Sequence, residues 1–161
     1  MNYSELYLVI DLIHTHRWAA LSCLYQGEPL AGMVAYVAEA DLSGFLLHLS
    51  QLAPHTRGLL EHPRAALVIS EADRGEGDPQ ILARLILQGR ITVIKNESED
   101  YLRAKAHYIQ RLPAAEPRFE FGDFQLFRLT PETLRYVGGF AQAHRVTVAQ
   151  LQAAQKQKRR P

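Results

Sequence analysis

The stretch that most constrains the fold is residues 44–71, GFLLHLSQLAPHTRGLLEHPRAALVISE. Two apolar runs of strand length, residues 44–50 and 64–70, flank a short polar segment in which Pro54 suits the start of a helix. This pattern predicts a strand, a short helix over residues 54–61 and a returning strand. Hydrogen-bond donors gather at the predicted helix start: Ser50, Gln51, His55, Thr56 and Arg57.

Such donors at a helix start are typical of a cradle for an anion such as phosphate. The alternative is an ordinary surface helix, because serine, threonine and proline are common at helix N-termini for reasons of capping alone. The residues themselves leave both interpretations open.

The rest of the chain predicts more strands than helices. Turn residues separate apolar runs that we expect to be strands, at residues 18–25, 30–38, 82–94, 123–129 and 134–140. Gly89 in the middle of the long run predicts a bulge or bend, as at a barrel corner. Helices are expected over residues 1–16, 97–112 and 148–156, and irregular structure over residues 113–122. The pattern favours a mainly β (α+β) fold, a small antiparallel barrel with a few peripheral helices.

Composition narrows the class of protein. The 161 residues suit one domain, and we expect a barrel domain over residues 1–146 followed by a terminal helix and basic tail over residues 147–161. A net charge of +1 gives no support for nucleic-acid binding, and the basic residues that end the chain suit a solvated terminus. We find neither a signal-peptide pattern nor an apolar run of about 18 residues, so we expect no membrane span. The single cysteine, Cys23, fits a reducing, cytoplasmic setting and a buried apolar role.

Arg84, Gln88 and Arg90 lie at even spacing in the run of residues 82–94, so they share one face of the predicted strand. An arginine in an apolar strand needs an anionic partner, because an unpaired buried charge is costly. That partner is either a bound ligand or a carboxylate of the chain, such as Glu71 or Asp123.

The seven histidines form no metal-binding motif. A single histidine can still ligate a haem iron, and His55 and His144 are the best placed, with an ordinary polar contact as the alternative for each. No nucleophile elbow, dinucleotide fingerprint or P-loop is present, so nothing supports catalysis by a side-chain nucleophile.

Several motifs follow one another in a specific order: LSxLAxHTR, HPRAALV, DPxxxARLxLxG, FGDFxLxRL and RYVGGFAxA. Together they resemble the pyridoxamine-5′-phosphate-oxidase-like FMN-binding split barrels, and within these the haem-utilisation (HugZ-like) branch. The resemblance covers residues 18–144. It implies a six-stranded antiparallel split barrel, a homodimer, and FMN bound as a small-molecule ligand in clefts at the dimer interface.

The resemblance also assigns residues. It implies that Met33, Val34 and Ala35 lie along the flavin ring, and that the segment of Leu49, Ser50 and Gln51 contacts the ring edge and ribityl chain. It further implies that His55, Thr56 and Arg57 bind the phosphate. Arg84 and Gln88 are then expected to reach the flavin of the neighbouring subunit. The chain departs from the family pattern at Met33, Gly58 and Ile86, where polar residues are usual.

These features predict an FMN-dependent oxidoreductase acting in haem iron utilisation. Some members of the haem-utilisation branch bind haem and degrade it oxidatively, with a histidine ligand in the C-terminal segment. Here no histidine follows His144, so His144 is the expected ligand if haem binds. The alternatives are therefore a haem-binding or haem-degrading protein with a histidine ligand, and a flavin-binding dimer without turnover, which the three polar losses favour.

Overall fold

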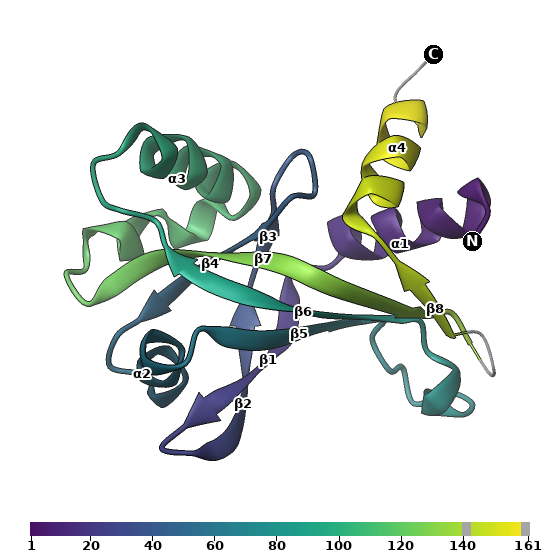
Figure 1. Ribbon diagram of the computed structural model, residues 1–161, viewed down its shortest axis with the longest axis horizontal. Helices are drawn as coiled ribbons and strands as arrows, with labels where there is room; N and C mark the ends of the chain where they lie inside the picture. Colours follow the sequence, from purple (N-terminus) through teal and green to yellow (C-terminus); the bar gives the residue numbers. More distant parts are fainter. Residues whose placement is uncertain (140–142, 159–161) are drawn as a thin grey trace.

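The computed structural model describes residues 1–139 and 143–158 (Figure 1). Within these residues, one antiparallel sheet curls around a core and carries helices at its ends and on part of its outer side. Its strands are β1 (Trp18–Tyr25), β2 (Glu28–Ala35), β3 (Val37–Ala38), β4 (Phe45–Ser50), β5 (Arg64–Ser70), β6 (Arg84–Val93), β7 (Phe124–Val137) and β8 (Ala143–Val146). The helices are α1 (Tyr3–Thr15), α2 (Pro54–Glu61), α3 (Glu99–Arg111) and α4 (Val148–Lys158), with 3-10 helices η1 (Pro79–Ile81) and η2 (Pro113–Glu120).

The order of the strands explains why the sheet curls. The order is β2-β1-β5-β6-β7-β4-β3, with β8 also paired to β7. β2 and β3 stand at opposite ends of this order, yet a single residue, Tyr36, separates them in the chain. The sheet must therefore bend round until its two ends meet. This confirms the predicted antiparallel split barrel, with eight strands in the described residues where the family resemblance implied six.

Several predicted elements are confirmed closely. β1 and α2 have the expected bounds, and the β6–β7 pairing shifts register between Gln88 and Gly89. A Cβ on Gly89 would lie 2.0 Å from the carbonyl oxygen of Thr130, so the bend requires glycine at this position.

Other predicted elements were wrong in extent. The expected strand over residues 30–38 is divided at Tyr36 into β2 and β3, and residues 113–120 form a 3-10 helix where we expected irregular structure. The two strands expected over residues 123–129 and 134–140 are one continuous strand, β7, although residue 140 lies outside the described residues. Pro131 passes through β7 opposite Gly89, at the bulge, where a ladder hydrogen bond is interrupted anyway. β8 was not predicted.

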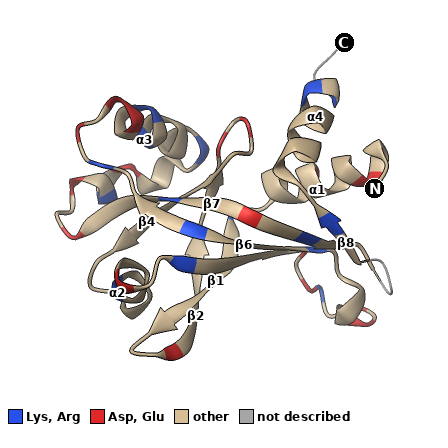
Figure 2. Ribbon diagram, viewed as in Figure 1, with Lys and Arg blue, Asp and Glu red and all other residues tan. Residues whose placement is uncertain are grey.

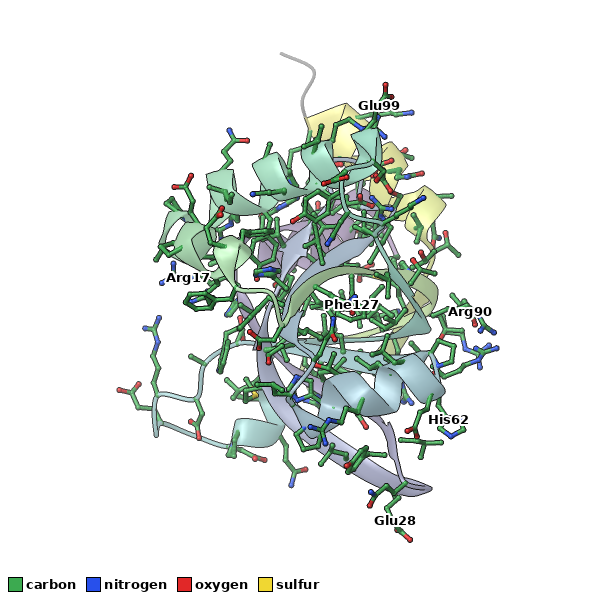
Figure 3. All side chains as sticks on the ribbon, turned by 90° about the vertical axis from the view of Figure 1, so that its left-hand side faces the viewer. Arg17, Glu28, His62, Arg90, Glu99 and Phe127 are labelled. Atoms are coloured by element: carbon green, nitrogen blue, oxygen red, sulfur yellow. The ribbon has the colours of Figure 1, made fainter. Side chains whose placement is uncertain are left out.

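Two apolar clusters stabilise the fold. The larger cluster fills the inside of the curl, where Phe127 is fully buried (Figure 3). The smaller cluster lies on the outer side of β4 and β7, under α3 and η2, and includes Leu46, Leu126 and Tyr108. The outer side of the remaining strands carries no such layer within the described residues.

The terminal helices pack against each other. Lys158 of α4 forms an ion pair of 2.5 Å with Asp11 of α1, and the side-chain amide of Gln155 lies 3.2 Å from Nε2 of His14. α1 begins with a capping box formed by Asn2 and Glu5. No helix in the described part of the chain has the length and apolar character needed to cross a bilayer.

Candidate functional site

The predicted anion cradle forms where β4 ends and α2 begins. Ser50 Oγ donates a 2.5 Å hydrogen bond to the carboxylate of Asp123 and accepts one from the amide of Leu52 at 3.2 Å. The backbone amide of Gln51 donates to the Asp123 carbonyl at 2.7 Å. Asp123 therefore holds the end of β4 against the start of β7, and the Ser50 hydroxyl is engaged in this contact.

The start of α2 has no side-chain cap, because its N-cap residue is Ala53. Arg57 is exposed in the first turn, and its Nε lies 3.4 Å from the carbonyl oxygen of Gln51. The positive end of the helix and one guanidinium group thus lie together at the surface, as an anion site needs.

The two residues before Arg57 point elsewhere. Thr56 is fully buried, and its hydroxyl has no hydrogen-bond partner among the described residues. His55 is half-buried near Gly32 of β2, and desolvation lowers the pKa of its imidazole. Within one chain, the predicted trio therefore presents Arg57 to solvent while Thr56 lies in the interior.

The packing of α2 explains why residue 58 is a glycine. A Cβ at this position would lie 2.1 Å from the carbonyl oxygen of Leu24, because α2 packs directly on the backbone of β1. The departure from the family pattern at Gly58 thus accompanies a close helix–strand approach that a larger residue would push apart.

The flavin-ring residues predicted on β2 divide between the two faces of the sheet. Val34 is buried inside the curl, whereas Met33 is 50% exposed on the outside. Residues directly opposite in neighbouring strands share a face. The register therefore aligns an outer row across four strands, Met33, Ala20, Val68 and Ile86, and Arg135 of β7 continues it. We call the outward side of β1, β2, β5, β6, β8 and the second half of β7 the outer sheet face.

Ala35 pairs with Trp18 of β1, which is 55% exposed, so this pair belongs to the outer sheet face too. Leu49, by contrast, is buried in the main core. Two departures from the family pattern, Met33 and Ile86, thus meet on one apolar row. Sequence alone could not reveal this, because the two residues come together only through the strand register.

Arg84 and Gln88 lie on the outer side of β6, as their spacing predicted. Arg84 donates to the carbonyl oxygens of Gln80 and Leu82 at 3.0 and 3.1 Å, and within the described residues it forms no ion pair with Glu71 or Asp123. Gln88 is exposed and accepts a hydrogen bond of 3.2 Å from Thr133 of β7.

His144 lies on β8 directly opposite Tyr136 of β7, while Arg145 lies opposite Arg135. The His144 side chain is therefore on the same side as buried Tyr136 and on the other side from the two arginines. Gln88 and His144 both line a depression of about 810 Å³ between β6, β7 and β8. None of the residues of the α2 cradle contributes to this depression, so the predicted site residues fall into two groups.

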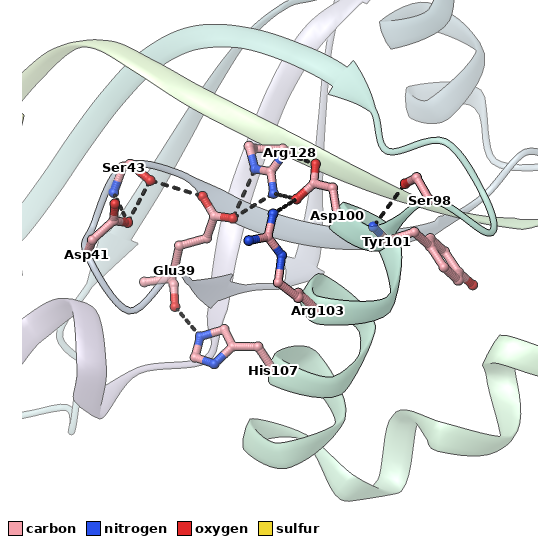
Figure 4. A network of polar contacts seen from close by, with 10 residues as sticks. Glu39, Asp41, Ser43, Ser98, Asp100, Tyr101, Arg103, His107 and Arg128 are labelled. Atoms are coloured by element: carbon pink, nitrogen blue, oxygen red, sulfur yellow. Dashed lines mark hydrogen bonds and ion pairs between the residues drawn. The ribbon is translucent and has the colours of Figure 1, made fainter.

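A polar network that sequence reasoning missed lies between α3 and the loop after β3 (Figure 4). Arg128 of β7 donates to Glu39 at 2.7 and 3.0 Å and to Asp100 at 2.7 and 2.8 Å. Hydrogen bonding to Arg128 lowers the pKa of Asp100, and Ser43 lowers that of Asp41 in the same way. These groups line a depression of about 760 Å³. Because Arg128 satisfies both carboxylates, the network holds α3 to the sheet.

His48 was also missed, since it is hidden in an apolar strand. Its ring stacks on Phe119 with centroids 3.8 Å apart, and Tyr108 and Phe124 contact its other sides. Burial lowers the pKa of His48 to about 4, and its Nδ1 has no partner among the described residues. This neutral histidine is part of the cluster under α3 and η2.

With this geometry established, comparison with known proteins identifies the family. Residues 10–153 match the family described as CREG, beta-barrel. The chain belongs to this family. The matched residues include every strand of the described sheet and parts of both terminal helices.

Two curated proteins resemble this CREG β-barrel chain in sequence. It is 32% identical over 119 residues to the chloroplastic non-canonical heme oxygenase HOZ of Arabidopsis thaliana, covering 74% of this chain and 35% of that protein. It is 26% identical over 123 residues to heme oxygenase HutZ of Vibrio cholerae, covering 76% and 69%. The chain thus spans about a third of the length of the plant protein.

Solved structures agree on the fold. A heme binding protein from Mycobacterium smegmatis has a TM-score of 0.81 at 25% identity, covering 95% of this chain and 61% of that one. HutZ from Vibrio cholerae has a TM-score of 0.73 at 21% identity, covering 80% and 91%. A protein of the pyridoxinephosphate oxidase family from Clostridium acetobutylicum has a TM-score of 0.69 at 13% identity and shows the fold alone, covering 94% and 99%. The predicted split-barrel family is thereby confirmed.

Proposed function

We propose that this protein binds haem as a homodimer and acts in haem utilisation, with oxidative haem breakdown as its reaction. Its relatives support this, since they include two heme oxygenases and a heme binding protein. The observation that carries the proposal is the outer sheet face, where a row of apolar side chains ends beside a pair of arginines on β7 and β8.

Haem has a flat apolar ring, two carboxylate groups at one edge, and an iron that takes a nitrogen ligand. The row of Met33, Ala20, Val68 and Ile86 supplies an apolar floor, and Arg135 follows directly at its end. Opposite Arg135, Arg145 adds a second cation. The chemistry of this face therefore fits the ring and its carboxylates. When haem is bound, its iron would supply the oxidative chemistry, and the residues of this chain would bind and orient the group.

A second copy of the chain is the expected cover for the outer sheet face. Trp18 and Met33 are 55% and 50% exposed there, next to small residues such as Ala20 that allow close approach. Burial of this surface between two copies would remove apolar area from water. A ligand that lies on this face would then be enclosed at the interface.

Two histidines remain candidates for the iron ligand. His144 precedes Arg145 in sequence, but the strand register places its side chain on the side of Tyr136. Ligation of an iron on the outer sheet face would therefore require β8 to rotate about its axis. His55 is half-buried with a lowered pKa, which keeps its imidazole in the neutral form that binds metals. We propose His144 first and His55 second.

FMN is the second candidate cofactor, favoured by exposed Arg57 at the uncapped start of α2. In this case Arg57 would hold the phosphate, and the residues of β2, β4 and β6 named from the resemblance would contact the flavin. Arg57→Ala should then weaken FMN binding at least tenfold and leave the fold intact, whereas haem binding should not change.

An intracellular, cytoplasmic setting remains our expectation from the single reduced Cys23.

The deciding experiment is an absorption spectrum of the purified full chain, titrated with haem and separately with FMN. Haem binding predicts a saturable Soret band, and FMN binding predicts a shifted flavin spectrum with quenched fluorescence. His144→Ala and His55→Ala should identify the iron ligand, with His62→Ala, an exposed histidine, as the matched control. A Soret band that persists unchanged in both variants would reject both ligand assignments.

Sedimentation of the same samples tests the assembly, because a strictly monomeric haem-loaded protein would contradict a site at the interface.

Addition of a chemical reductant to the haem-loaded protein in air then separates haem binding from haem breakdown. Loss of the Soret band with formation of a bile pigment supports breakdown, and a stable band supports a binding protein without turnover.

A further inference from the structure

Four arginines of the outer sheet face form two cross-strand pairs of like charge. Arg64 of β5 lies directly opposite Arg90 of β6, and Arg135 of β7 lies directly opposite Arg145 of β8. Figure 2 shows these strands carrying blue segments on neighbouring ribbons, with a red segment on β7 between them. Like charges directly opposite one another destabilise a sheet unless an anion neutralises them.

One of the two pairs is partly neutralised within the chain. Arg64 forms an ion pair of 2.5 Å with Glu132 of β7. The side chains of Arg135 and Arg145 have neither a hydrogen bond nor an ion pair with any residue that the structure describes. Both are exposed, and no carboxylate of the described residues pairs with either of them.

The surroundings of this pair favour an anion. Both arginines line the depression of about 810 Å³ between β6, β7 and β8. Glu132 is the one carboxylate among its lining residues, and Arg64 already pairs with it. α4 begins at the same edge: Thr147 lines the depression and its hydroxyl accepts from the amide of Gln150 at 3.1 Å. The positive end of the α4 dipole therefore adds to the field of the two guanidinium groups.

We infer that Arg135 and Arg145 form an anion-binding site that takes a carboxylate or phosphate group between β7 and β8. The forked guanidinium group matches both kinds of anion through paired hydrogen bonds. A bound anion bridges the two strands, so its binding also stabilises β8, which pairs with β7 over only four described residues, and α4 behind it. The inference deepens the proposed haem site, in which the same pair would face the haem carboxylates, but it is argued from the arginine pair, the depression and the start of α4 without haem.

The test uses the full chain without haem or flavin. Inorganic phosphate and succinate, the second as a dicarboxylate, are each titrated by calorimetry at constant ionic strength set with chloride. We expect saturable binding of at least one of them, an increase in Tm, and slower amide hydrogen exchange over residues 143–158. Arg135→Gln and Arg145→Gln should each weaken binding about tenfold or more. Arg74→Gln, which removes one exposed charge from the loop before η1, is the matched control and should bind as wild type does.

A second readout separates a ligand site from a structural role. In chloride alone, Arg145→Gln should be as stable as wild type or more stable, because it relieves the repulsion between the opposed arginines. Equal anion affinity in wild type and both variants would overturn the inference, as would a Tm increase that chloride reproduces at the same ionic strength. These outcomes do not depend on whether the chain binds haem, so the two proposals can fail separately.

Discussion

The phenolic hydroxyl of Tyr36 donates a 2.8 Å hydrogen bond to the carbonyl oxygen of Ile13. Tyr36 is the residue at which the two ends of the sheet order meet, and Ile13 lies in the last turn of α1. The last-turn carbonyls of a helix lack partners within the helix. Arg111 of α3 donates to the next one, the His14 carbonyl, at 2.7 Å. The end of α1 is thus held by residues from two distant parts of the chain.

Tyr36→Phe should therefore destabilise the fold. The change removes the donor and leaves the buried Ile13 carbonyl without it, which costs about 1–3 kcal/mol. Urea denaturation monitored by circular dichroism measures the free energy of unfolding. Tyr25→Phe is the control, because the Tyr25 hydroxyl contacts only the exposed side chain of Gln26 at 3.4 Å among the described residues, and we expect a loss within about 0.5 kcal/mol. Equal losses in the two variants would show that the buried hydrogen bond contributes nothing.

Gly58→Ala should destabilise the packing of α2 on β1. The new methyl group would lie 2.1 Å from the Leu24 carbonyl oxygen, so the helix must move away, at a cost of about 1–3 kcal/mol or more. Gly122→Ala is the matched control, since a Cβ there meets no atom of the described residues within 4 Å. Thermal unfolding of both variants measures the difference. A Gly58→Ala chain as stable as wild type would mean that α2 can shift freely.

Arg128→Lys should loosen α3 from the sheet. Lysine keeps the charge but loses the fork that contacts Glu39 and Asp100 together, and we expect a loss of about 1–2 kcal/mol in the free energy of unfolding. Arg103→Lys is the control, because its side chain is 80% exposed and its contact with Asp100 is 3.7 Å long. The ranking of the two variants by urea denaturation tests the assignment, and a larger loss in Arg103→Lys would contradict it.

His48 should make the fold sensitive to mild acid. Burial lowers its folded-state pKa from 6.5 to about 4, so between these values the unfolded chain takes up a proton that the folded chain does not. Above pH 6.5 the imidazole is neutral in both states, so it does not reduce the free energy of unfolding. As the pH falls from 6.5 toward 4, protonation of the unfolded chain lowers the free energy of unfolding, by about 3 kcal/mol at most. His48→Phe should remove that part of the pH dependence, measured as unfolding free energies at about pH 7 and pH 5.

A matched variant separates the contribution of His48 from the general effect of acid on the free energy of unfolding. His62→Gln replaces an exposed histidine and should keep the pH dependence of wild type. If His48→Phe retained the same slope as His62→Gln, the buried imidazole would not be its source.

The sequence predicted the family, the antiparallel curl, β1 and α2 with their bounds, and the bend at Gly89, because each depends on local residue chemistry or on an ordered set of motifs. It did not predict that β7 runs through Pro131, since Thr-Pro-Glu-Thr is turn chemistry in isolation. Only the pairing with Gly89 at a bulge makes proline acceptable there. Local signals cannot report such a tertiary exception.

The same limit applies to the site. Sequence spacing placed Arg84 and Gln88 on one side of β6, which the structure confirms. The opposed pair of Arg135 and Arg145, however, depends on the β7–β8 register, and β8 itself is too short to leave a clear pattern. The burial of the Thr56 hydroxyl likewise depends on how α2 rests on β1, which Gly58 decides.

The junction at Tyr36 also limits how copies of this chain can associate. Exposed strand edges invite another chain to add a strand, and proteins suppress this with closed sheets and very short edge strands. Here the end strands of the sheet are neighbours in the chain, and β3 is only two residues long. Edge-to-edge addition at the β3 end therefore finds little free backbone, and β2, with eight residues, is the longer of the two end strands.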